Sequence, residues 1–181
     1  MSEGNQRRLM ERDTKDSLRY LKSMSETNAR WLIEQETVGA LRYIDRLSEE
    51  NARWLILQNK SKCFGDVDQM NEETQRWLFQ QAKDNKWDLE EAYQEIMFTS
   101  VKNKPMMLFI PLDLQHEVFQ WDKKKTLNNI GQMSEENLRW LLQQTKAGHW
   151  DKAEVSNALT RAEKVGDDKK ITEALAILNG M

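Results

Sequence analysis

The most regular pattern in this chain is a twelve-residue string in which apolar residues follow a tryptophan and polar residues fill most other places. It runs from Met133 to Gln144 as MSEENLRWLLQQ, and earlier copies begin at Met24, Leu47 and Met70. Positions 24, 47 and 70 are evenly spaced, so the first three copies repeat with one period. Apolar residues three and four positions apart predict a short amphipathic helix in each copy. The chain is therefore expected to be a helical-repeat protein.

Each copy carries a residue suited to starting a helix immediately before a glutamate. These residues are Ser25, Ser48, Asn71 and Ser134. Their side chains can accept a hydrogen bond from a backbone N–H of the first turn, and the glutamate suits the positive end of the helix dipole. We therefore predict a separate short helix after each one. The alternative is a continuous helix through Ser25 and Ser48, because one heptad stripe contains Leu18, Leu21, Ser25, Asn28, Leu32 and Gln35.

The third and fourth copies share an extension that the first two lack. A second tryptophan, Trp87 or Trp150, follows the first by ten residues, and an Asp-x-x-Glu cap comes next. Each long copy is predicted to be a helical hairpin. The predicted arms are residues 71–83 and 88–102 in the third copy, and residues 134–146 and 151–164 in the fourth. Residues 167–178 are expected to form a terminal capping helix.

One stretch breaks the helical pattern. Residues 104–111, KPMMLFIP, place five large apolar residues between two prolines. Proline disfavours a regular helix through this stretch, so we expect an extended path. The segment has two interpretations. It is either a buried crossover between two halves of one domain, or an apolar anchor that docks on a partner through Met107 and Phe109.

The expected fold is all-α: an array of short helical repeats whose last two copies become hairpins, with an extended apolar crossover. The chain is expected to form a single domain over residues 1–181. Its possible halves are residues 5–103 and 112–181, joined by 104–111. Seven glycines and two prolines in 181 residues agree with an almost wholly helical chain.

Composition narrows the possible functions. The net charge of −3, with both signs interspersed, provides no global field for recruiting nucleic acid or an anionic membrane. No apolar run reaches the length of a membrane span, and the N-terminal residues do not resemble a signal peptide. A single cysteine, Cys63, fits a reducing compartment. We therefore expect a cytoplasmic protein.

The candidate interaction residues are the polar and aromatic side chains that recur in the copies. Asn, Trp and Gln at positions i, i+3 and i+7 share one helix face. With the two apolar crossover residues, the set is Asn28, Arg30, Trp31, Gln35, Asn51, Arg53, Trp54, Gln58, Arg76, Trp77, Gln81, Asn137, Arg139, Trp140, Gln144, Met107 and Phe109.

A structural interpretation competes with the functional one. Each repeat arginine lies four residues after a glutamate, which predicts ion pairs along the helix surface. The pairs are Glu26–Arg30, Glu49–Arg53, Glu72–Arg76 and Glu135–Arg139. Each tryptophan can pack one copy on the next. Asn and Gln remain unexplained, because a buried amide needs partners that the string does not supply.

The sequence offers no recognisable catalytic site. His116 and His149 have no partners at zinc-ligand spacing, no glycine-rich phosphate loop is present, and Cys63 has no identifiable base beside it. We therefore predict no cofactor and no enzymatic activity. The leading hypothesis is a protein-interaction or assembly module that binds a partner protein or associates with itself. The alternative is a binder of single-stranded nucleic acid or a phosphate ligand, which is possible but not favoured.

Overall fold

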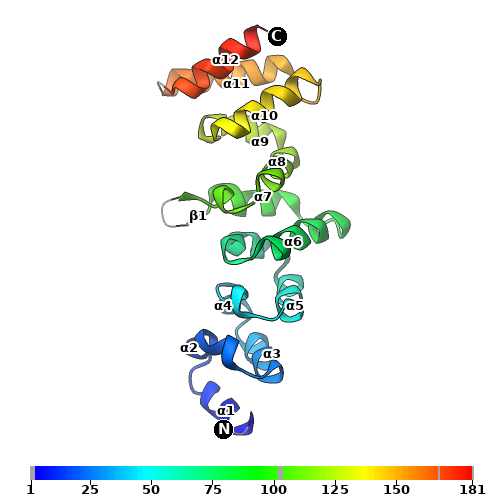
Figure 1. Ribbon diagram of the computed structural model, residues 1–181, viewed down its shortest axis with the longest axis vertical. Helices are drawn as coiled ribbons and strands as arrows, with labels where there is room; N and C mark the ends of the chain where they lie inside the picture. Colours follow the sequence, from blue (N-terminus) through cyan, green and yellow to red (C-terminus); the bar gives the residue numbers. More distant parts are fainter. Residues whose placement is uncertain (1–2, 102–103, 167, 181) are drawn as a thin grey trace. The chain divides into compact units, whose positions relative to one another are not determined.

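The computed structural model describes residues 3–101, 104–166 and 168–180, and it belongs to the all-α class (Figure 1). The chain divides into two compact units, residues 1–114 and 115–181, and the boundary falls within helix α8 (Leu112–Trp121). Among the described residues, no helix is both long enough and apolar enough to cross a membrane.

Unit 1 consists of short α-helices that alternate with 3-10 helices, labelled η. In chain order they are α1 (Glu3–Met10), α2 (Thr14–Ser17), η1 (Leu18–Ser23), α3 (Glu26–Gln35), α4 (Thr37–Leu41), η2 (Ile44–Arg46), α5 (Glu49–Asn59), η3 (Lys60–Gln69), α6 (Glu72–Asp84) and α7 (Leu89–Phe98). The antiparallel pair β1 (Ser100–Val101) and β2 (Lys104–Pro105) follows, and then η4 (Met106–Phe109).

Unit 2 contains most of α8 and five further helices. These are α9 (Lys123–Asn128), η5 (Ile130–Gln132), α10 (Glu135–Lys146), α11 (Lys152–Val165) and α12 (Lys169–Asn179). The expected arm over residues 151–164 corresponds to α11, and the expected terminal helix over 167–178 corresponds to α12, with residue 167 outside the described part of the chain. The arm expected over residues 88–102 is shorter than predicted, because α7 ends at Phe98 and β1 follows.

Each copy of the string starts a helix at the residue that the sequence predicts. Ser25, Ser48 and Ser134 accept a hydrogen bond through Oγ from the backbone N–H three residues later, and Asn71 does the same through Oδ1. The ψ angles of Ser25 and Ser48 are 152° and 154°, which is extended backbone. A continuous helix through these two residues is therefore excluded, and separate short helices are confirmed.

The two residues after each repeat tryptophan form the core of each copy. They are Leu32 and Ile33, Leu55 and Ile56, Leu78 and Phe79, and Leu141 and Leu142, all buried. The residues three and two positions before each tryptophan are also buried, so the inward face of the helix is set by positions i, i+1, i+4 and i+5. The tryptophan itself lies at the edge of this face.

The segment around the two prolines departs from its expected extended path. Only Lys104 and Pro105 are extended, and Met106–Phe109 forms η4. A 3-10 turn needs no continuous α-helical ladder, so it tolerates prolines at both ends. Met107 is 6% exposed and lies in the core, Phe109 is half-buried, and Leu108 is 54% exposed.

Hydrogen bonds fix η4 on the helices of the third copy. The Gln75 side-chain nitrogen lies 2.9 Å from the Val67 carbonyl oxygen and 3.1 Å from that of Phe109, and it donates to both. The backbone N–H of Met106 donates to the Thr99 carbonyl at 2.9 Å. The apolar segment is therefore an integral part of unit 1.

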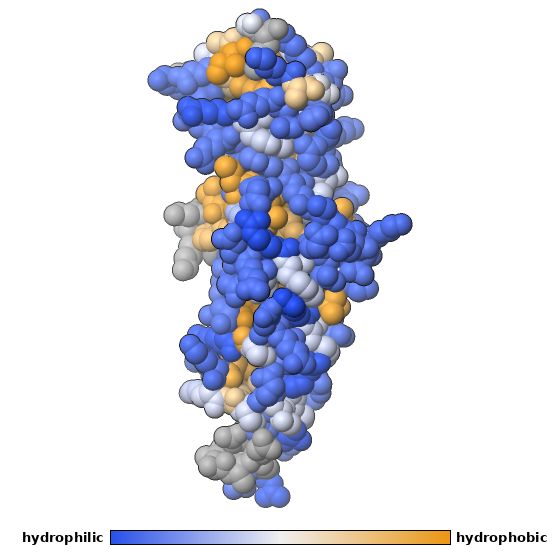
Figure 2. Space-filling view, turned by 45° about the vertical axis from the view of Figure 1, so that its right-hand side comes forward, coloured by the Kyte–Doolittle hydropathy of each residue, from blue (hydrophilic) through white to orange (hydrophobic). Residues whose placement is uncertain are grey.

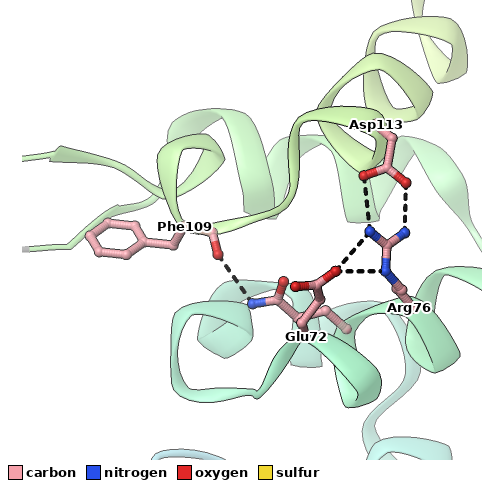
Figure 3. Close-up of polar contacts among 5 residues, drawn as sticks. Glu72, Arg76, Phe109 and Asp113 are labelled. Carbon is pink, nitrogen blue, oxygen red and sulfur yellow. Dashed lines mark hydrogen bonds and ion pairs between the residues drawn. The ribbon is translucent and has the colours of Figure 1, made fainter.

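An ion pair joins α6 to the first turn of α8. Figure 3 shows the Arg76 guanidinium facing both Asp113 and Glu72. Its Nη1 lies 2.6 Å from Asp113 Oδ2, and its Nη2 lies 3.2 Å from Oδ1. This fork lowers the pKa of Asp113, because hydrogen bonds from a cation favour the ionised carboxylate.

We expect the Asp113–Arg76 pair to make stability depend on pH in the acidic range. The pKa of Asp113 is lower in the folded chain than in the unfolded chain, so the pair stabilises above an unfolded pKa of about 3.9 and is lost as pH falls through the folded value. Asp113→Asn should lower the urea midpoint of unfolding slightly at pH 7 and have no effect once the carboxylate is protonated. The exposed Asp45→Asn is the control. Equal midpoints for Asp113→Asn and the parent chain at pH 7 would contradict the prediction.

Candidate interaction surface

The four repeat tryptophans share one kind of contact and are all half-buried. In each case the side chain that lies over the indole ring precedes the tryptophan by the same number of positions in the chain. Arg7 lies over Trp31 at 5.9 Å, Arg30 over Trp54 at 3.9 Å and Arg53 over Trp77 at 5.4 Å, and His116 stacks on Trp140 at 4.2 Å with an interplanar angle of 6°. A guanidinium over an indole face is a favourable cation–π arrangement.

The junction between the first two copies explains the repeated asparagine. Asn51 is 2% exposed. Its Oδ1 accepts a hydrogen bond from Arg30 Nη1 at 2.9 Å, and its Nδ2 donates to Glu26 Oε1 at 2.7 Å. The same Glu26 oxygen accepts from Ser48 Oγ at 2.7 Å. One carboxamide thus uses both its acceptor and its donor to join consecutive copies.

Arg7 makes the equivalent contact one copy earlier, and the sequence patterns did not identify it. Its Nε donates to Asn28 Oδ1 at 3.3 Å. The spacing of the copies could have identified it. The first twelve residues, MSEGNQRRLMER, align with the copy from Met24 at the same period and keep its Ser, Glu, Asn and Arg positions. Arg8 stands where later copies have tryptophan. Both Arg8 and Asn5 are exposed.

The fourth copy uses two different side chains for the same junction. Gln115 Oε1 accepts from Asn137 Nδ2 at 2.8 Å, and His116 takes the place that arginine has over the tryptophan. Ile110 and Met133 are separated by the same number of residues as Met24 and Leu47. A divergent copy of the string therefore begins at Ile110, and the spacing alone could have identified it. Asn137 is 2% exposed, and its Oδ1 has no hydrogen-bond partner among the described residues.

Three of the four predicted ion pairs within a copy are confirmed. Arg53 pairs with Glu49, Arg76 with Glu72 and Arg139 with Glu135. The predicted Glu26–Arg30 pair is wrong. Arg30 lies 3.7 Å from Glu34 instead, because the next copy takes both Glu26 and the end of the Arg30 side chain. Each of these guanidinium groups therefore has a carboxylate beside it.

Trp54 is flanked by two hollows in the surface of unit 1. One, of about 440 Å³, is lined by Arg30, Glu49, Glu50, Arg53, Trp54 and Leu57. The other, of about 430 Å³, is lined by Glu34, Thr37, Val38, Trp54, Gln58 and Asn59. Val38 is 70% exposed and Leu57 is 42% exposed. We call Val38, Trp54 and Leu57 with these two hollows the Trp54 surface. Figure 2 shows that apolar side chains on one face form separate patches within a largely hydrophilic surface.

The remaining candidate residues do not converge on one place. Gln35 and Gln58 are exposed, and Gln58 lines a hollow of the Trp54 surface. Gln81 accepts a hydrogen bond from Asn85 at 3.0 Å, and Gln144 lies 2.7 Å from His149 Nδ1, so both bond within their own copy. The hydrogen bonds of Gln81 and Gln144 therefore do not involve the repeat asparagines.

The described residues hold no group of three metal-ligating side chains. Cys63 is fully buried, and burial raises the pKa of its thiol. A buried neutral thiol is a poor nucleophile. The described residues therefore form neither a three-residue metal site nor a reactive thiol, and the Trp54 surface is the candidate site that contains predicted interaction residues.

Comparison with known proteins adds no relative. No protein-family model, curated protein or solved structure matches this chain.

We expect Arg30→Ala to destabilise the chain by about 2 kcal/mol, because it removes the donor to a buried amide oxygen and uncovers one face of Trp54. Urea unfolding followed by tryptophan fluorescence measures the change. The matched control is Arg139→Ala, whose arginine has the same motif position but forms only an exposed pair with Glu135. The control should cost less than about 0.5 kcal/mol. Equal effects of the two substitutions would show that the junction contact adds nothing.

A second prediction concerns the divergent copy. Position 116 precedes Asn137 and Trp140 by the same separations that place Arg30 before Asn51 and Trp54, so His116→Arg introduces a guanidinium in the matching register. The new side chain can donate to Asn137 Oδ1, so the urea midpoint should rise. His116→Lys is the control, because a lysine supplies the charge without the planar fork. A midpoint lowered by His116→Arg would contradict this prediction.

Proposed function

We propose that this chain is a non-enzymatic interaction module built from helical repeats, and that it binds a partner protein through the Trp54 surface. One observation supports this most: an indole ring lies between two hollows and beside two exposed aliphatic side chains, Val38 and Leu57. Aromatic residues in partly enclosed surroundings are the usual anchors of protein interfaces. The contact from Arg30 pre-orders the ring, which lowers the entropic cost of binding.

The repeat array itself is part of the proposal. In our interpretation, the junctions at Asn28, Asn51 and Asn137 stack one copy on the next, and the chain works as a scaffold. The single buried thiol suits the reducing conditions of the cytoplasm, where we place the protein.

The charges around the Trp54 surface favour a protein partner over a nucleic acid. Arg30 lies beside Glu34, Arg53 pairs with Glu49, and Glu50 also borders the first hollow. Nucleic-acid binding depends on basic groups that are free to neutralise phosphates. The succession of arginines and tryptophans along unit 1 favours the nucleic-acid alternative, since aromatic rings can stack on bases. The local carboxylates oppose it.

The test begins with self-association. Size-exclusion chromatography with light scattering, over a wide range of protein concentrations, shows whether the mass stays at that of one chain, 21.4 kDa. A larger mass that returns to 21.4 kDa in the Leu57→Asp variant would show that the partner is a second copy.

If the chain is monomeric, we expect peptides selected from a displayed random library to bind at the Trp54 surface. Leu57→Asp and Val38→Asp should each weaken the selected peptides by about tenfold or more, since a desolvated charge is costly in an apolar contact. The matched control is Tyr20→Asp, which changes another exposed residue of unit 1. Peptide binding that both surface variants leave unchanged would refute the proposal. Salt-dependent binding of single-stranded RNA that weakens in Trp54→Ala would support the alternative instead.

A further inference from the structure

A second candidate binding site lies in unit 2, in a groove of about 540 Å³ between α9, η5 and α11. Its apolar lining comes from Leu127, Ile130, Ala158, Ala162, Val165 and Ile171. Val165 at the rim is 90% exposed. An open apolar groove of this size is large enough to receive several side chains of another segment.

The corresponding place in unit 1 is already filled by part of the chain. The third and fourth copies align without a gap when Asn71 is matched with Ser134. In this alignment Val67 corresponds to Ile130, and Thr99 corresponds to Ala162. Both Ile130 and Ala162 line the open groove.

Hydrogen bonds show that η4 lies beside Val67 and Thr99 in unit 1. Gln75 bridges the carbonyl oxygens of Val67 and Phe109, and the Met106 N–H donates to Thr99. The 3-10 helix packs against both η3 and α7, and Met106 is fully buried. The third copy thus covers this place with a short turn, Met106–Phe109, whose two methionines are buried.

In the fourth copy the residues that align with η4 are 169–172, and they form the first turn of α12 instead of a 3-10 turn. After α11 the chain passes Gly166 and enters α12, which packs on α10 and α11 and reaches the groove only through Asp168 and Ile171. In the alignment, Ala158 and Ala162 stand where the third copy has Glu95 and Thr99, so the groove is more apolar than its counterpart, and no 3-10 turn covers it among the described residues.

The two copies differ in charge at this place, and the difference indicates which charge a segment bound in the groove would carry. Arg161 lines the groove at the position where the same alignment places Phe98 of the third copy. Arg161 is exposed, and its hydrogen bond from Nη2 to Asn128 Oδ1 is long, at 3.5 Å. An exposed guanidinium with such a weak contact is suited to pair with a carboxylate of an incoming segment.

We propose that this groove binds a short apolar turn of a partner protein that presents Met, Leu, Phe or Ile side chains and a neighbouring Asp or Glu for Arg161. The site is in a different unit from the Trp54 surface and does not depend on it. The chain provides its own probe: residues 104–113, KPMMLFIPLD, contain the turn that fills the equivalent site and an aspartate.

The experiment measures binding of the fluorescein-labelled peptide KPMMLFIPLD to the full chain by fluorescence anisotropy. We expect saturable binding that a peptide with both methionines replaced by serine does not show. Methyl NMR spectra should show shifts of the Ala158 and Ala162 methyl groups on addition of the peptide, because both residues line the groove.

Two variants locate the site. Ala162→Phe fills the groove. Arg161→Glu reverses the charge of a side chain that lines the groove, and the position is exposed, so the substitution should not prevent folding. Each should weaken the peptide by about tenfold or more. The matched control is Lys164→Glu, which makes the same charge change on an exposed residue of α11 outside the groove, and it should bind normally. Circular dichroism confirms that each variant is folded.

Two results would overturn the proposal. The first is the absence of peptide binding to the parent chain. The second is binding that persists in Arg161→Glu and Ala162→Phe, because the peptide would then occupy another site, such as that of η4 in unit 1. Loss of binding in Leu57→Asp concerns only the Trp54 surface, so the two proposals fail or succeed separately.

Discussion

The buried carboxamide of Asn51 constrains the arrangement of the first two copies. At 2% exposure it cannot rely on water, and an unpaired buried amide costs about 1–3 kcal/mol. Its donor and acceptor are both satisfied only when Glu26 and Arg30 of the preceding copy lie on either side of it. This requirement fixes the register between the copies more narrowly than apolar packing does, because apolar contacts tolerate small shifts.

Variation at this junction follows the chemistry of the residues that replace asparagine or arginine. The third copy has Thr74, which has no amide to present, and Arg53 keeps its contact with Trp77 while pairing with Glu49. At Asn137, Gln115 accepts from the amide nitrogen as Glu26 does at Asn51, and His116 covers Trp140 as Arg30 covers Trp54. The aromatic contact is thus kept at every junction, whereas the amide contact changes.

Local features of this fold could be predicted from the sequence, and contacts between copies could not. The helix starts at Ser25 and Ser134 were predictable because an N-cap and its partner are only three residues apart. The predicted Glu26–Arg30 ion pair was wrong, because the spacing within one helix does not show whether residues of the next helix bind the same side chains. Arg7 and His116 were missed because both copies lack the tryptophan, and the copy with His116 also lacks the arginine. The extended crossover failed because proline disfavours an α-helix but permits a 3-10 turn.

The position of Trp54 links the scaffold to the proposed interface. Arg30 lies over its ring and also donates to Asn51, while two hollows border the same indole. A partner that contacts the ring would therefore also affect Arg30, whose guanidinium donates a hydrogen bond across the junction between the two copies. By linkage, any binding that favours the stacked position of Arg30 must also strengthen the junction by the same free energy. Under the proposed function, a ligand bound at one copy would therefore affect the junction with the next copy.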